Sequence, residues 1–74
     1  MFENIDTARY VLQAFLSTNG RMNECLDSAG RGLSPEELKS FKMAVGNVMY
    51  EVFDKVIEPI CKRHPSLKPP EMED

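Results

Sequence analysis

Apolar residues recur at alternating spacings of three and four along the first part of the chain. The series starts at Ile5 and ends at Ala29, and Asn19 is its polar member. A heptad pattern of this kind is typical of an amphipathic helix with one buried face. We therefore expect a helix over residues 5–29, capped by Asn4 or Asp6. The apolar members of the series are Ile5, Ala8, Leu12, Phe15, Met22, Leu26 and Ala29.

The dipeptide Asn19-Gly20 lies inside this helix, although such a pair is a common turn signal. The heptad phase is the same on both sides of it, whereas an inserted turn would shift the phase. We therefore predict one continuous helix with Gly20 on its exposed side, at a cost of about 1 kcal/mol. The alternative is a break at this dipeptide, which would give a three-helix monomer.

A second helix is signalled by the residues at its start. Ser34 is followed three residues later by Glu37, which is the capping-box pattern, and a proline stands at the first helical position. The apolar pattern then continues to Pro59, which has no backbone N–H and kinks or ends a helix. We predict a helix over residues 35–58 that, if only kinked, continues to about residue 63.

This second helix is apolar over more than half of its circumference. One apolar stripe is formed by Leu38, Phe41, Val45, Val48, Val52 and Val56. A second stripe, rotated well to the side, is formed by Met43, Gly46, Tyr50, Phe53 and Ile57. A helix with two apolar flanks needs two partners, and the chain offers one other long helix. The second stripe is therefore expected to be an association surface.

These features predict an all-α fold over residues 1–63, an antiparallel two-helix hairpin that dimerises into a four-helix bundle. The second stripe would be the dimer interface. Gly46 would allow two backbones to approach closely there, or it is an ordinary exposed helix glycine. Asn19, inside the heptad series, would fix register and oligomeric state, or it marks a local helix break.

The segment 64–74 is a proline-rich, polar tail, which we expect to be mobile or draped over the surface. Basic residues cluster just before it at Lys62 and Arg63. These two residues and Tyr10, on the polar side of the first helix, are candidate contacts for another protein.

Composition narrows the classes of function. The chain has 74 residues and a net charge of −3, which argues against nucleic acid as a partner. Two cysteines are too few for the disulfide framework of a small secreted domain, and neither a secretory signal nor a membrane-spanning apolar run is evident. We therefore expect a cytoplasmic protein without a membrane segment.

Candidate chemistry is sparse. Cys61 and His64 have the spacing of half a zinc site, but four ligands are needed and a lone pair is a weak signal. No phosphate-binding loop or catalytic motif is present, so we predict no cofactor and no enzymatic activity. The sequence favours a small homodimeric helical protein that acts as a protein-interaction or regulatory module. The alternative is a helical dimer that binds RNA or DNA.

Overall fold

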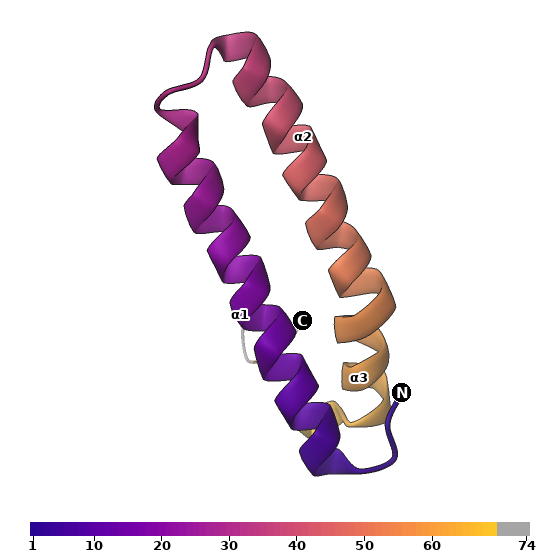
Figure 1. Ribbon diagram of the computed structural model, residues 1–74. Helices are drawn as coiled ribbons and strands as arrows, with labels where there is room; N and C mark the ends of the chain where they lie inside the picture. The colour runs from indigo at the N-terminus through magenta and orange to yellow at the C-terminus, as the bar shows by residue number, and fades with distance from the viewer. Residues whose placement is uncertain (70–74) are drawn as a thin grey trace.

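The computed structural model describes residues 1–69, which form an antiparallel helical hairpin (Figure 1). Helix α1 spans Ile5–Gly30 and helix α2 spans Pro35–Val52. A π-helical turn, η1 (Phe53–Ile57), joins α2 to the short helix α3 (Glu58–Arg63), and a 3-10 turn, η2 (Pro65–Leu67), follows. The predicted all-α hairpin is therefore confirmed, whereas its dimerisation stays a prediction.

Helix α1 is continuous through Asn19 and Gly20, so the alternative with a break at that dipeptide is wrong. Its cap is Asn4, whose side-chain oxygen accepts hydrogen bonds from the backbone N–H groups of Asp6 (2.8 Å) and Thr7 (3.1 Å). Gly20 lies on the exposed side, and among the described residues no atom outside its own helix backbone lies within 4 Å of the position a Cβ would take. The helix tolerates this glycine because neighbouring turns, packed on one face, supply its stability.

Helix α2 begins with the capping box that the sequence predicts. The Ser34 hydroxyl accepts from the Glu37 backbone N–H (3.2 Å), and the Glu37 carboxylate accepts from the Ser34 backbone N–H (3.0 Å). These bonds satisfy two donors that a helix start would otherwise leave unpaired. The hydrogen bond from the Ser34 backbone, followed by that with its side chain, lowers the pKa of Glu37.

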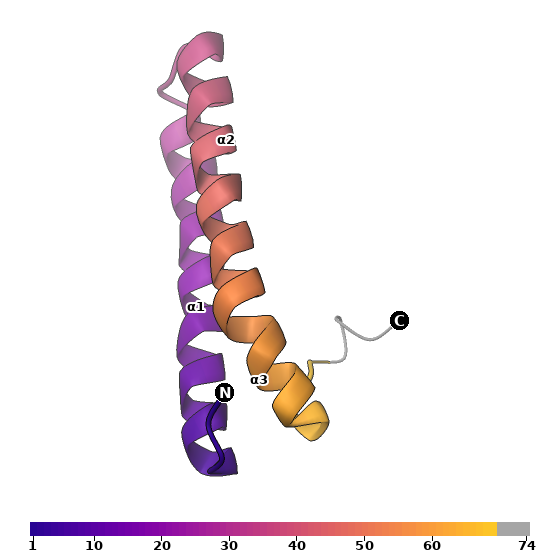
Figure 2. The same ribbon diagram turned by 90° about the vertical axis from the view of Figure 1, so that its right-hand side faces the viewer.

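Pro59 accounts for the π-helical turn. In a regular α-helix the proline ring would clash with the carbonyl of Lys55 four residues earlier. In η1 the backbone N–H of Glu58 instead bonds to the carbonyl of Phe53, five residues earlier, and the wider turn relieves the clash. The helix continues as α3 but bends away from the direction of α2, as Figure 2 shows.

The extra residue in η1 also resets which side chains face α1. One residue corresponds to about 100° of rotation, so the side chains beyond η1 are turned by about that angle. Ile57, Ile60 and Cys61 consequently all face inward and are buried with Ala8 and Leu12 of α1. This cluster is the core, and it lies at the open end of the hairpin rather than along its length.

The C-terminal segment packs in part against this core. Leu67 contacts the core cluster, and Lys68 and Pro69 are half-buried, so the described part of the predicted tail lies on the surface of the hairpin. The rest of the tail, positions 70–74, lies outside the described residues. At the same end the His64 Nε2 lies 2.8 Å from the Phe2 carbonyl oxygen. A carbonyl only accepts, so Nε2 carries the proton and donates it.

Candidate interaction surface

Helix α2 packs against α1 through one side that is only half-buried. None of its 18 residues is fully buried. The side chains that face α1 are half-buried and recur at helical spacings of three and four, with Met49 in the place predicted for Val48: Leu38, Phe41, Val45, Met49 and Val52. Val48, which the sequence assigned to this stripe, is half exposed, because its position lies at the edge of the contact. A single layer of contact with α1 therefore leaves much of α2 uncovered.

A second apolar side of α2 is not covered by α1. Met43 is 62% exposed, Tyr50 is 64% exposed and Phe53, at the start of η1, is 38% exposed. Gly46 lies between them on the same side, and in the described part of the chain no atom beyond its own helix backbone lies within 4 Å of the position a Cβ would take. We refer to Met43, Gly46, Tyr50 and Phe53 as the α2 stripe. Four of the five residues predicted for the dimer interface thus share an uncovered face.

The fifth residue, Ile57, does not share this face, and its assignment to the stripe is wrong. It is 1% exposed and belongs to the core of the hairpin itself. Uninterrupted α-helical spacing would place it with Phe53, but the π-helical turn rotates it towards α1. The signal in the sequence was Pro59, whose effect on phase was not included in the prediction.

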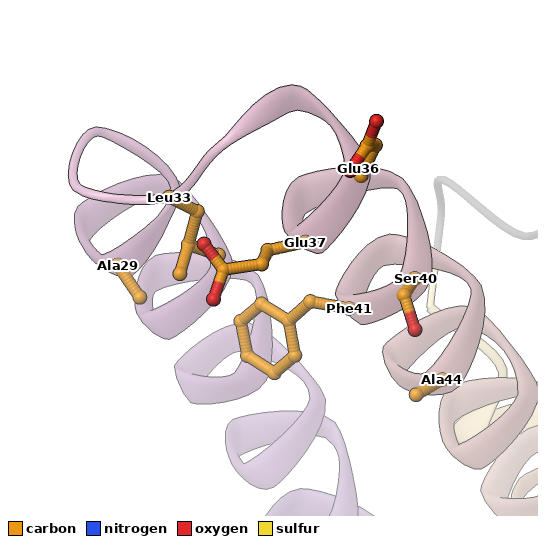
Figure 3. A pocket seen from close by; sticks show the side chains of 7 residues that line it. All are labelled: Ala29, Leu33, Glu36, Glu37, Ser40, Phe41 and Ala44. Carbon is orange, nitrogen blue, oxygen red and sulfur yellow. The ribbon is translucent and has the colours of Figure 1, made fainter.

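A shallow, open groove lies near the loop end of the hairpin (Figure 3). Its volume is about 700 Å³, and its walls come from the end of α1, the loop and the first turns of α2. Figure 3 shows that the Glu37 carboxylate reaches toward the loop beside Leu33, whereas the Glu36 side chain, which also lines the groove, extends in a different direction. The small side chains of Ala29 and Ala44 help to leave this space open. No pattern in the sequence predicts this groove.

The heptad asparagine, Asn19, is half-buried on the side of α1 that continues the core face. Its Oδ1 atom is buried and has no hydrogen-bond partner within residues 1–69. A buried, unpaired polar atom costs about 1–3 kcal/mol. Such a cost is characteristic of a polar residue that specifies register at the expense of stability. The role of Asn19 in register stays a prediction.

Cys61 and His64 are held by structural contacts. Cys61 is buried in the core, and this burial raises the pKa of its thiol, so the neutral form is favoured. His64 bonds to the Phe2 carbonyl. Across residues 1–69, no three side chains of histidine, cysteine or acidic type are grouped closely enough to hold a metal ion. Cys25, the other free thiol, is exposed on α1.

The three candidate partner contacts remain on the surface. Tyr10 is 75% exposed on α1. Lys62 forms an ion pair with Glu58 (3.2 Å), and Arg63 is exposed at the end of α3. These residues are accessible, but they do not form a common hollow with the groove, which lies at the opposite end of the hairpin.

Within residues 1–69, no helix has both the length and the apolar character needed to cross a bilayer. Comparison of the chain with protein-family models, with curated proteins and with solved structures finds no match.

Proposed function

We propose that this chain is a non-enzymatic protein-interaction module that works as a homodimer. Two hairpins pack through their α2 stripes and form a four-helix bundle. The observation that carries this proposal is that an amphipathic helix as long as α2 has no fully buried residue. Helices in folded proteins owe most of their stability to packing of an apolar face. A second hairpin would therefore supply packing for α2 that α1 alone does not provide.

The surface area of the chain supports this proposal. Its accessible surface is 5504 Å², whereas the usual scaling for a folded monomer of this mass gives about 4,600 Å². The excess of roughly 900 Å² is comparable to the ~800 Å² that each partner buries in a standard interface. The elongated shape agrees: the radius of gyration is 14.6 Å, compared with about 11 Å for a compact chain of this length.

The direction of the α2 stripe also fits a four-helix bundle. Met49 faces α1, and Tyr50, the next residue, is exposed. Consecutive residues differ by about 100° around a helix, so the two apolar sides are close to a right angle apart. In a four-helix bundle each helix has two neighbours in roughly this arrangement. The stripe therefore points where the second neighbour of α2 would lie.

In such a dimer the outward surfaces would serve recognition of other proteins. Tyr10 and Arg63 are exposed and lie on α1 and α3, not on the helix that carries the α2 stripe. Exposed tyrosine and arginine side chains are enriched at protein interfaces. They are the first positions to substitute once a partner protein has been captured with the dimer as bait.

The test is solution mass by light scattering, with helicity measured by circular dichroism on the same samples. Concentrations from about 1 to about 200 µM are appropriate, because dissociation of a dimer depends on concentration. The proposal requires a mass of twice 8.4 kDa at the upper concentrations. A fully helical monomer throughout the range would contradict it. Met43→Asp, on an exposed position that folding of the hairpin does not use, should shift the equilibrium to monomer.

The alternative of an RNA- or DNA-binding dimer has less support. Arg9 forms an ion pair with Asp6 (2.8 Å) near the open end of the hairpin. Lys39 and Lys42 lie in the first turns of α2, near the loop at the opposite end. These cations are spread along the molecule, whereas phosphate binding favours basic residues clustered on one surface.

A further inference from the structure

The α2 stripe has a charge of opposite sign at each end. Lys39 precedes Met43 by one helical turn and lies on the same side of α2. Asp54 follows Tyr50 by one turn and lies at the edge of that side. Both side chains are exposed, and within residues 1–69 neither takes part in an ion pair. The stripe is thus basic toward the loop end and acidic toward the open end.

This distribution distinguishes the two ways of pairing α2 with a second α2. A parallel pair related by a two-fold axis would place Lys39 of one copy against Lys39 of the other. An antiparallel pair would place Lys39 of each copy against Asp54 of the other, twice per dimer. Like charges that face one another at an interface disfavour that arrangement, and opposite charges favour it. The antiparallel pairing is therefore the complementary one.

The charged pairs and the apolar pairs give the same register for the antiparallel arrangement. The midpoint of Lys39 and Asp54 falls between Gly46 and Asn47, and the midpoint of Met43 and Tyr50 falls at the same place. One register therefore aligns both charge pairs and sets Met43 of each copy against Tyr50 of the other. It also brings the two Gly46 residues to the crossing point, where a missing side chain allows close approach of two helices.

Within one chain this missing side chain is not used. Apart from the adjacent helix backbone, no atom of residues 1–69 lies within 4 Å of the Cβ position at Gly46, so no contact among these residues requires glycine there. A glycine inside a helix costs about 1 kcal/mol relative to alanine. A contact that uses the small size of Gly46 would therefore be made with another molecule, on the exposed side that carries the stripe.

We propose that the partner of the α2 stripe is the same stripe of a second copy in antiparallel orientation, centred between Gly46 and Asn47, with Lys39 of each copy against Asp54 of the other. This inference rests on the proposed homodimer and specifies its geometry. Isologous pairing of one surface with itself is the commonest form of a closed dimer.

Disulfide trapping tests the orientation. In a Cys25→Ser parent, the variants Met43→Cys and Tyr50→Cys are oxidised separately and as an equimolar mixture. The antiparallel register predicts a disulfide-linked heterodimer in the mixture and little linked homodimer from either variant alone, because Cβ atoms must come within about 4.5 Å. Mass spectrometry separates the products. The parent controls for Cys61, whose buried thiol is expected to stay reduced.

Exchanging the two charges gives a second test, with the dimer Kd as its readout. These substitutions leave the apolar residues of the stripe unchanged. Lys39→Asp and Asp54→Lys should each weaken the dimer, raising Kd by roughly tenfold, as two attractive pairs become repulsive. The double variant Lys39→Asp/Asp54→Lys should return Kd to within about threefold of the native value. Additive weakening in the double variant would overturn the inference.

The outcomes separate this inference from the proposed function. A native chain that stays monomeric by light scattering overturns both. A native dimer that gives linked Met43→Cys homodimers, or no linked product in the mixture, leaves the homodimer standing and overturns the antiparallel geometry. A heterodimer in the mixture together with recovery in the charge-exchanged double variant supports both.

Discussion

At the scale of single residues, a long-range polar contact joins the two chain segments at the open end of the hairpin. The ring of His64 donates to the carbonyl of Phe2, which joins two segments 62 residues apart in sequence. Phe2 has a positive φ of 64°, a conformation that is uncommon for residues other than glycine. The contact thus holds the start of the chain against the end of α3, beside the core. Gly20 and Gly46, by contrast, make no contact that depends on their lacking a side chain.

These two glycines provide a matched pair of substitutions. Gly20→Ala and Gly46→Ala each replace an exposed helix glycine, so in dilute solution each should stabilise the hairpin by about 1 kcal/mol. At high concentration the two should differ, because a methyl group at position 46 would separate the paired α2 helices. Urea unfolding of dilute samples and Kd from light scattering measure the two effects. Equal Kd values for both variants would show that close approach at Gly46 does not occur.

At the scale of elements, α2 and η1 differ in what determines their boundaries. Helix α2 starts where side chains of Ser34 and Glu37 satisfy its first donors. The turn η1 arises where Pro59 cannot accept α-helical geometry, and its position decides which residues reach the core. The capping box is a local pattern and was predictable from the sequence. The width of the turn was not, because a proline can end, kink or widen a helix, and packing decides which.

The capping box predicts a dependence of stability on pH. Hydrogen bonds from Ser34 lower the pKa of Glu37 in the folded chain below its ordinary value of 4.5. The stabilisation is therefore fully present above pH 4.5 and is lost as the pH falls through the lowered folded value. Urea midpoints of the native chain and of Glu37→Gln, measured from neutral pH downward, should converge as the native carboxylate is protonated. Glu36→Gln, in the same turn but outside the box, controls for the loss of a charge.

The π-helical turn predicts that Ile57 supports folding rather than association. Ile57→Ala should destabilise the hairpin by about 2–5 kcal/mol, because it leaves a cavity in the core. The milder Ile57→Val, expected to cost about 0.5–1.5 kcal/mol, serves if the alanine variant does not fold. Met43→Ala, at an exposed position, should change the unfolding free energy of dilute protein by no more than about 0.5 kcal/mol. Similar decreases in the free energy of unfolding for Ile57→Val and Met43→Ala would contradict the assignment of Ile57 to the core.

Features that depend on residues close together in sequence could be predicted, whereas features that depend on tertiary packing could not. The heptad series predicted α1 through Gly20, and the local caps predicted both helix starts. Four members of the α2 stripe were placed correctly on one exposed face because their positions depend only on regular helical spacing. Ile57 and the groove near Leu33 depend on tertiary geometry: the first on a reset of helical phase, the second on how the end of α1, the loop and the first turns of α2 are placed around the groove.

At the scale of the whole molecule, the stabilising contacts are unevenly distributed. The hairpin measures 45 × 21 × 16 Å, and the five buried apolar residues found within residues 1–69 lie in the half that contains α3. Figure 1 shows that the loop end lies far from that half. Regions with few buried apolar contacts open more readily than the rest of a protein. In a single copy, the half of α2 next to the loop is therefore the part expected to unfold locally first.

Hydrogen exchange measures this difference directly. In dilute protein the amides near Leu12 and Ile60 should exchange most slowly, and those near Met43 should exchange faster. At concentrations where the dimer forms, protection near Met43 should rise, whereas protection near Leu12 should rise only as far as global stability does. Uniform protection along α2 at every concentration would contradict both the uneven core and the coverage of the stripe.

The π-helical turn has a consequence for how this chain compares with others. Five residues from Phe53 to Ile57 occupy a stretch that an ordinary α-helical turn fills with about four, so the turn is equivalent to a one-residue insertion. A homologue that lacks Pro59 and is one residue shorter there would present the same side chains to α1. An alignment that allows no gap in this stretch would pair Ile57, Ile60 and Cys61 with surface positions of that homologue. The spacing across η1 is therefore expected to vary by one residue without a change of fold.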